Sequence, residues 1–252
     1  MKVSVLSSGS KGNTTYIESN NAKILIDLGN TSKYVKEKLE DLGVFPGDID
    51  AILITHTHVD HIGGLKIFAK KYNIPVVTEL TSIEQVKKYA NKLDIIQIGT
   101  RNMYNYELLK EVGKLKTPVI LKRGLSATYN EWLLAAEYIK NAGNDNIILC
   151  ERGIRTYETY TRNTLDLSAI PAVKKLSHLP VVVDPSHAAG KWWMVDPLAK
   201  AAVAVGCDGL IIEVHNNPAC AWCDGQQSIK PSVYGKLVEE LKVIAKAVGR
   251  EI

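Results

Sequence analysis

The chain has 252 residues, 46% of them hydrophobic, and a formal net charge of +4. This length is enough for one large α/β barrel or two modest domains, and this charge is too small to argue for nucleic-acid binding. No apolar run approaches the roughly 20 residues of a membrane-spanning helix, and the N-terminus shows no signal-peptide pattern. The four cysteines suggest no extracellular disulfide framework, so we expect a soluble cytoplasmic protein.

Short apolar strands and amphipathic helices alternate along the chain. Two strand patterns, at 2–6 and 14–18, flank a turn-rich loop and come before the repeat. The repeat has strands at 24–28, 51–55, 75–79, 95–99, 118–122, 147–151, 180–184 and 209–215, and helices at 32–42, 62–71, 82–90, 106–112, 129–141, 168–176, 195–205 and 232–248. Eight βα units in this length predict an α/β fold, a (β/α)8 TIM-like barrel with an N-terminal β-hairpin extension. An open doubly wound sheet is the alternative.

A cluster of candidate metal ligands follows the strand at 51–55. His56, His58, Asp60 and His61 stand within six residues, and imidazole with carboxylate suits Zn²⁺ or a similar divalent ion. We therefore predict metal binding by these four residues. Together with the loop at 7–13, the segment up to about residue 76 resembles the N-terminal part of a metallo-β-lactamase-fold hydrolase. The resemblance implies metal-dependent hydrolysis as one candidate activity.

Four cationic side chains stand at or just beyond the ends of predicted strands, and these are Arg101, Lys122, Arg152 and Arg155. Active sites of such barrels lie at the carboxyl ends of the strands. Several cations converging there indicate an anionic ligand that carries phosphate and carboxylate groups. His187 follows the seventh strand, Glu213 lies in the eighth and Asp224 follows it, and together they predict a divalent-metal site.

The stretches at 97–103, 121–124, 150–155, 184–190 and 211–215 closely resemble 3-deoxy-D-arabino-heptulosonate 7-phosphate (DAHP) synthase, from about residue 74 onward. That family condenses phosphoenolpyruvate with erythrose 4-phosphate and uses one divalent metal. The resemblance implies His187, Glu213 and Asp224 as ligands of a Zn, Mn, Fe or Co ion. It implies Arg101, Lys122, Arg123, Arg152 and Arg155 as substrate-binding residues, with Lys122 and His187 catalytic. Family members are usually oligomers, and the oligomeric state here stays open.

Two family features fall before a seam at 72–80, and the chain lacks both. They are a cysteine ligand at the end of strand one and a Lys-Pro-Arg-Thr element after strand two. We therefore interpret the chain as an engineered or recombinant chimera, with a hydrolase-like segment 1–76 and a synthase-like segment 77–252 completing one composite barrel over 1–252. The expected activity is little or none. An active synthase, a metal-dependent hydrolase and a purely structural design are the alternatives.

Overall fold

The computed structural model describes residues 2–9, 12–19, 22–55, 59–79, 83, 85–86, 93–221 and 223–251. The chain forms two compact units, Met1–Gln97 and Ile98–Ile252. This boundary follows residue 97, whereas the sequence places its seam near residue 76. Within the described ranges, no helix is long and apolar enough to cross a membrane.

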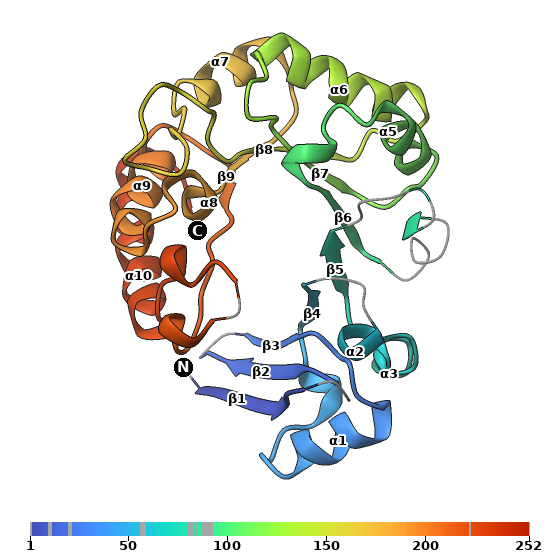
Figure 1. The fold of residues 1–252 in the computed structure, drawn as a ribbon. Helices are drawn as coiled ribbons and strands as arrows, with labels where there is room; N and C mark the ends of the chain where they lie inside the picture. The colour runs from blue at the N-terminus through green and yellow to red at the C-terminus, as the bar shows by residue number, and fades with distance from the viewer. Residues whose placement is uncertain are drawn as a thin grey trace. The chain divides into compact units, whose positions relative to one another are not determined.

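The first unit is built on a mixed sheet whose strands are hydrogen-bonded in chain order (Figure 1). The strands are β1 (Lys2–Ser7), β2 (Thr14–Glu18), β3 (Lys23–Ile26), β4 (Ala51–Ile54), β5 (Val76–Glu79) and β6 (Ile95–Ile98). The pairs β1–β2 and β2–β3 are antiparallel, and the pairs from β3 to β6 are parallel. The N-terminal hairpin and the start of the parallel repeat near residue 24 therefore lie where the sequence predicts them.

Two short helices replace the single helix predicted at 62–71. The helices with both ends among the described residues of this unit are α1 (Ser32–Glu40), η1 (Pro46–Asp48), α2 (Val59–Ile62) and α3 (Leu65–Tyr72). The chain breaks between α2 and α3 because it passes against the loop after β3: Gly64 donates its N–H to the Leu28 carbonyl at 3.0 Å. A Cβ on Gly64 would stand 2.1 Å from the Asn30 carbonyl oxygen, so only glycine fits. Most of the helix predicted at 82–90 lies outside the described residues.

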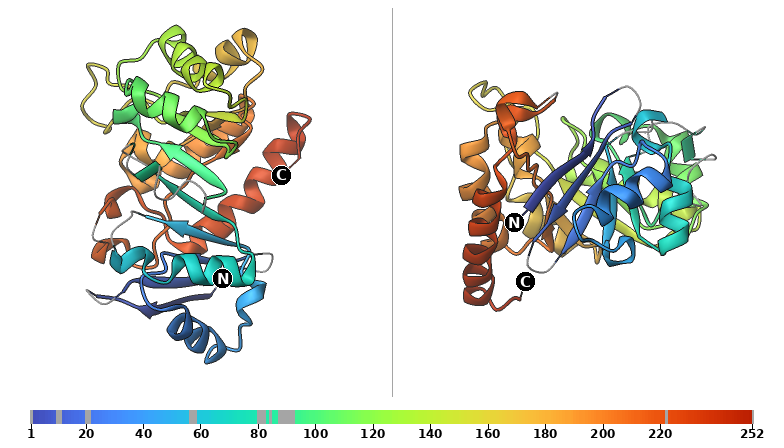
Figure 2. Two further views of the ribbon diagram at one scale, coloured as in Figure 1. Left: turned by 90° about the vertical axis from the view of Figure 1, so that its right-hand side faces the viewer. Right: turned by 90° about the horizontal axis from the view of Figure 1, so that it is seen from below.

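The second unit repeats strand and helix in order. Its elements are η3 (Thr100–Asn102), α5 (Tyr106–Gly113), β7 (Val119–Lys122), α6 (Tyr129–Asn141), β8 (Ile147–Glu151), α7 (Ala169–Leu176), β9 (Val181–Val183), α8 (Pro185–Ala189), α9 (Trp192–Ala204), β10 (Gly209–Leu210), η4 (Pro218–Cys220), η5 (Gly225–Gln227) and α10 (Pro231–Ala247). Strands β7 to β10 pair in parallel, and α9 packs along α10 (Figure 2). The carboxyl ends of these strands therefore face the same way.

Strand β10 is shorter than the strand predicted at 209–215. The Ile211 N–H still donates to the Val183 carbonyl at 2.8 Å, and beyond it the backbone turns to other partners: the Glu213 N–H donates to Ser186 Oγ at 3.0 Å, and the Glu213 carbonyl accepts from the Ile229 N–H at 2.9 Å. An isolated bridge joins Val214 to Ile229. These bonds draw Glu213 out of the sheet ladder and toward α8.

Helix α6 is fixed to the sheet by Trp132. A capping box between Thr128 and Glu131 starts the helix. Trp132 is fully buried, and its Nε1 donates to the Leu121 carbonyl at 3.1 Å. The indole therefore fills the space between α6 and β7 with its polar atom satisfied.

Replacing Trp132 by alanine is expected to lower the free energy of unfolding by about 3–5 kcal/mol, because it empties a large aromatic site in the core. Denaturant unfolding followed by circular dichroism gives the value. The matched control is Trp193→Ala, whose side chain is 49% exposed and whose loss should change stability by roughly 0.5 kcal/mol or less. Equal effects of the two substitutions would contradict this account of α6.

Candidate functional site

Acidic and basic residues gather where the strands of the second unit end. Lys122 is the last residue of β7, Glu151 the last of β8, and Asp184 follows β9 directly. All three are buried. Because buried charges need partners, the contacts among these side chains show how the site is organised.

Asp184 connects a lysine with a histidine. Its Oδ2 atom lies 2.9 Å from Lys122 Nζ and 2.7 Å from His187 Nδ1, and its Oδ1 accepts the His187 backbone N–H at 2.9 Å. Burial acts to raise the pKa of this carboxyl, but the bonds from His187 and the charge of Lys122 prevail and hold the pKa far below its usual range. Asp184 is therefore an anion that fixes both side chains.

His187, Glu213 and Asp224 come together as one cluster. His187 Nε2 lies 3.1 Å from Glu213 Oε1, and a ligand atom of each of the three residues lies within 4.8 Å of the others. Burial raises the pKa of Glu213, and the nearby charges of Asp224 and Asp184 raise it further, while His187 opposes them. The structure thus brings together the three metal ligands that the sequence predicts near the last two strands.

The donor set of this cluster fits a divalent cation. One imidazole nitrogen and two carboxylates suit hard to borderline ions, and a cation would relieve the repulsion between Glu213 and Asp224. Asp184 holds Nδ1 of His187 and so leaves Nε2 facing the two carboxylates, the usual carboxylate–histidine arrangement behind a metal ligand. A cavity of about 1340 Å³ opens beside Asp224 and is also lined by Arg162 and Gln227.

Arg152 carries an unsatisfied donor. Its side chain is 6% exposed, and its Nη1 is buried with no hydrogen-bond partner among the described residues. Burial lowers the pKa of the Arg152 guanidinium, and Asp184 only partly offsets this. A buried cation with a free N–H is destabilising unless an anion meets it, so the structure supports Arg152 as a site for an anionic group.

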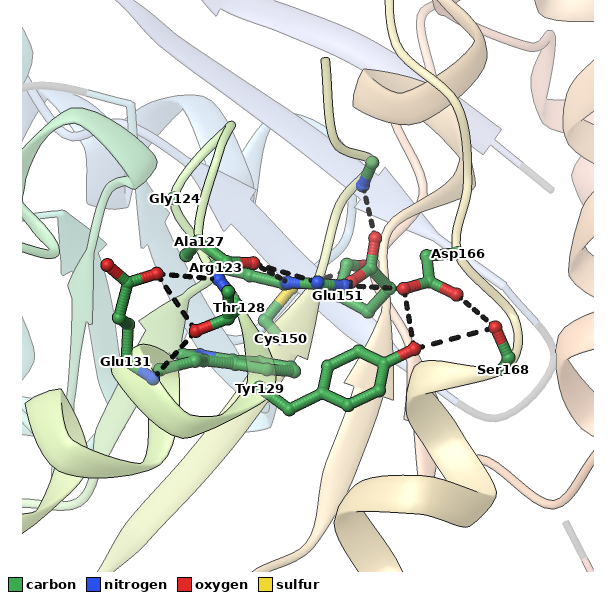
Figure 3. Close-up of polar contacts among 12 residues, drawn as sticks. Arg123, Gly124, Ala127, Thr128, Tyr129, Glu131, Cys150, Glu151, Asp166 and Ser168 are labelled. Atoms are coloured by element: carbon green, nitrogen blue, oxygen red, sulfur yellow. Dashed lines mark hydrogen bonds and ion pairs between the residues drawn. The ribbon is translucent and has the colours of Figure 1, made fainter. Parts of the chain in front are cut away.

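Arg123 is engaged within the protein (Figure 3). Its Nη1 lies 2.8 Å from Glu151 Oε2 and 2.8 Å from Asp166 Oδ2, while Nε and Nη2 donate to the Ala127 carbonyl at 3.0 and 2.8 Å. The guanidinium also lies 4.8 Å from the Tyr129 ring centroid. The donors of this predicted substrate residue thus face protein groups.

Arg101 and Arg155, the other two predicted substrate residues, are exposed. Arg101 lies in η3 after β6, and Arg155 follows β8 with its backbone N–H donating to the Leu125 carbonyl at 2.7 Å. Among the described residues, neither guanidinium makes a contact that indicates where a ligand would bind. Their role in binding stays a prediction.

The N-terminal cluster is a buried pair with polar neighbours. His61 Nδ1 lies 2.7 Å from Asp27 Oδ2, and Thr55 Oγ1 donates to the same carboxylate. Asn13 Nδ2 donates to Asp60 Oδ2 at 3.1 Å, and His61 Nε2 lies 3.5 Å from that oxygen. His56 and His58 lie outside the described residues. The candidate metal cluster found among the described residues is that of His187, so metal binding by Asp60 and His61 stays a prediction.

Sequence reasoning assigned no role to the acids that hold the basic residues. Asp184, Glu151 and Asp166 each contact a lysine, an arginine or a histidine. Position in the sequence could have identified two of them. Glu151 stands at a strand end next to Arg152, and Asp184 stands at a strand end close to His187. An acid beside a predicted cation at a strand end is a candidate partner for it.

Family comparisons give two matches. A model described as "DAHP synthetase I family" matches residues 54–248, and one described as "Anti-Pycsar protein Apyc1" matches residues 6–91. The phospho-2-dehydro-3-deoxyheptonate aldolase of Thermotoga maritima is 51% identical over 188 residues, which are 75% of this chain and 56% of that protein. The 2-dehydro-3-deoxyphosphooctonate aldolase of Geobacter sulfurreducens is 35% identical over 197 residues, 72% of this chain and 71% of that protein.

A solved structure is similar over nearly the whole chain. It is a truncated form of 3-deoxy-D-arabino-heptulosonate 7-phosphate synthase from Thermotoga maritima, with a TM-score of 0.75, 42% identity and coverage of 94% of both chains. This likeness confirms the predicted fold class: an α/β fold of the TIM-barrel type. The antiparallel strands β1 to β3 are its N-terminal extension.

The interpretation as a chimera is wrong. The likeness to one solved chain covers 94% of this sequence and so extends into the first 76 residues, and the family match begins at residue 54, before the supposed seam. The idea of a metallo-β-lactamase segment rested on a few short motifs, which carry less information than agreement along the chain. With 51% identity to the Thermotoga aldolase, the expectations of an engineered origin and of little or no activity are overturned as well.

Proposed function

Because the chain belongs to the DAHP synthetase I family, we propose that it condenses phosphoenolpyruvate with erythrose 4-phosphate to give DAHP and phosphate. The observation that carries the proposal is the buried carboxylate of Asp184, which contacts both Lys122 and His187. Through this contact, a cation suited to an anionic substrate lies beside the imidazole of the candidate metal cluster, which consists of His187, Glu213 and Asp224. The match covers only 56% of the Thermotoga aldolase. The activity named for that protein is therefore a proposal for this chain.

The reaction needs one new carbon–carbon bond and the loss of one phosphate. C3 of phosphoenolpyruvate attacks the aldehyde carbon, and the aldehyde oxygen takes a proton. Water adds to C2 and the bond from C2 to the phosphate oxygen breaks; one proton of the water leaves with the phosphate, and the other replaces the proton taken by the aldehyde oxygen. The site must therefore hold two anionic substrates, stabilise charge on the aldehyde oxygen and supply a proton.

The residues divide these tasks. Arg152, with its buried free donor, and Lys122, held by Asp184, bind the carboxylate and phosphate of phosphoenolpyruvate. The Lys122 ammonium is also the group we assign to protonate the aldehyde oxygen. A divalent ion held by His187, Glu213 and Asp224 would polarise the aldehyde carbonyl.

Three further predictions from the sequence concern Arg101 and Arg155, the identity of the metal and the cellular compartment. Arg101 and Arg155 are exposed cations near strand ends and would add to the cations that hold phosphoenolpyruvate. Which of Zn, Mn, Fe or Co binds is left to measurement. The four cysteines are unpaired, which suits a reducing compartment, and we place the reaction in the cytoplasm.

Loss of phosphoenolpyruvate, followed by ultraviolet absorbance, tests the proposal. Turnover is expected only when erythrose 4-phosphate and a divalent metal are both present, with equal amounts of phosphate released and DAHP formed. A chelator should abolish the signal, and added metal should restore it. No consumption of phosphoenolpyruvate with any of the four metals would refute the proposed reaction.

The acceptor can be checked in the same assay. The names of the two relatives differ by one carbon, heptonate and octonate, and since phosphoenolpyruvate brings three carbons, the acceptors have four and five. We expect the four-carbon aldose phosphate to give the higher kcat/KM, because the relative with the heptonate product shares 51% identity and the other 35%. The opposite preference would reassign the acceptor within the family.

A further inference from the structure

One network around the buried Arg123 fastens both ends of the loop at 152–166. Glu151, before the loop, and Asp166, at its end, each lie 2.8 Å from Arg123 Nη1. A pair of backbone hydrogen bonds at 2.9 Å joins Ile154 to Thr164 and closes the loop as a hairpin. From this geometry we infer that Arg123, Glu151 and Asp166 are positioning residues that set the Arg152 guanidinium for phosphoenolpyruvate, an inference that rests on the proposed function.

The first anchor acts on the backbone next to Arg152. Glu151 Oε1 accepts the Gly153 N–H at 2.7 Å, so one carboxylate spans the residue between them. Gly153 has a φ of +90°, and a Cβ there would stand 2.8 Å from Asn163 Cβ. The turn around Arg152 is therefore held by the Glu151 carboxylate, and Arg123 holds that carboxylate in turn.

The second anchor acts on the far end of the loop. Asp166 Oδ2 accepts from Arg123 and, at 2.9 Å, from the Tyr129 hydroxyl. Burial raises the pKa of Asp166, but the bonds from Arg123, Ser168 and Tyr129 outweigh it and lower the pKa, so the anchor is an anion. Arg123 itself is only 4% exposed, which keeps water from competing for these bonds.

The loop also contacts the candidate metal cluster of His187, Glu213 and Asp224. Arg162, in the returning half of the loop, lies 2.8 Å from Asp224 Oδ1 and 2.8 Å from Gln227 Oε1. Its backbone N–H donates to the Ala189 carbonyl at 3.0 Å. A loop whose base is fastened by Arg123 thus carries one residue for the anion and another that contacts a proposed metal ligand.

The informative substitution removes one anchor and leaves the other. Replacing Arg123 would leave the buried carboxylate of Glu151 and the half-buried carboxylate of Asp166 without their shared cation, a change expected to unfold the unit. Asp166→Asn keeps the side-chain shape and leaves the Arg123–Glu151 pair intact. Tyr129→Phe is milder still, because it removes a single hydrogen bond to Asp166.

The test is the dissociation constant of phosphoenolpyruvate, measured by calorimetry on folded protein in the presence of Mn²⁺. Asp166→Asn should weaken binding by roughly 10- to 100-fold, by analogy with the loss of groups that hold metal ligands in place, and Tyr129→Phe should weaken it less. Both should raise KM for phosphoenolpyruvate more than they lower kcat. If Asp166→Asn does not fold, Tyr129→Phe decides.

The matched control is Asp208→Asn. Asp208 also accepts from two cations, Lys174 at 2.7 Å and Arg250 at 2.9 Å, in the same unit. Its loss should lower thermal stability and leave the dissociation constant unchanged. Unchanged binding in Asp166→Asn and Tyr129→Phe, with wild-type binding intact, would overturn the inference alone. Failure of the wild type to bind phosphoenolpyruvate would overturn the proposed function and the inference together.

Discussion

Replacing His187 by alanine is expected to remove the bound divalent ion and to lower kcat/KM by about 10³-fold or more, since charge stabilisation by a metal is worth several kcal/mol. Nε2 of His187 lies 3.1 Å from Glu213, and Asp184 fixes the other ring nitrogen. The substitution leaves two carboxylates without the imidazole between them. Elemental analysis of dialysed protein gives the metal content apart from any assay of turnover.

The control is an exposed histidine of the same unit. His178 is exposed in the loop between α7 and β9, so His178→Ala should retain both metal and activity. Full metal content in His187→Ala would contradict the ligand assignment, whatever the effect on turnover.

Replacing Lys122 by methionine is expected to lower kcat/KM by about 10²–10³-fold, as the loss of a single well-placed donor does in other sites. The ammonium lies 2.9 Å from Asp184 in a site where the lysine side chain is 8% exposed. Methionine keeps the length of the side chain and removes the charge and the proton. Binding of phosphoenolpyruvate should weaken together with turnover.

The loss of Lys122 also leaves the buried Asp184 with one fewer cation, so stability has to be followed by thermal unfolding. Lys175→Met is the matched control, because Lys175 is exposed on α7. It should change neither quantity. A Lys122→Met protein that is folded and binds phosphoenolpyruvate as tightly as the wild type would contradict the assigned role.

The fold could be predicted because the strands are marked by short apolar runs in the local sequence. The run Ile147–Glu151 is apolar up to Cys150 and becomes charged at its end, and the structure has β8 over the same five residues. Two elements depended on contacts from elsewhere in the chain. The chain breaks between α2 and α3 because the loop after β3 passes beside Gly64, and beyond Ile211 the backbone leaves β9 because Glu213 bonds to Ser186 and Ile229 instead. No local pattern contains these partners.

The clustering of the candidate site residues was predictable where residue type is enough. A histidine and two acids near strand ends indicate a metal site, and the structure brings His187, Glu213 and Asp224 together. Pairing was not predictable. Arg123 and Arg152 look alike in sequence, yet one faces Glu151 and the other has a free buried donor. The difference depends on where the side chains point, which single-sequence patterns do not fix.

The most direct measurement of the central claim is a crystal structure of the protein with Mn²⁺ and phosphoenolpyruvate, with the ion located by anomalous scattering. We predict one ion bonded to His187 Nε2 and to the carboxylates of Glu213 and Asp224, with phosphoenolpyruvate bound through Arg152 and Lys122. An ion located away from these three ligands, or a substrate bound elsewhere, would contradict the account.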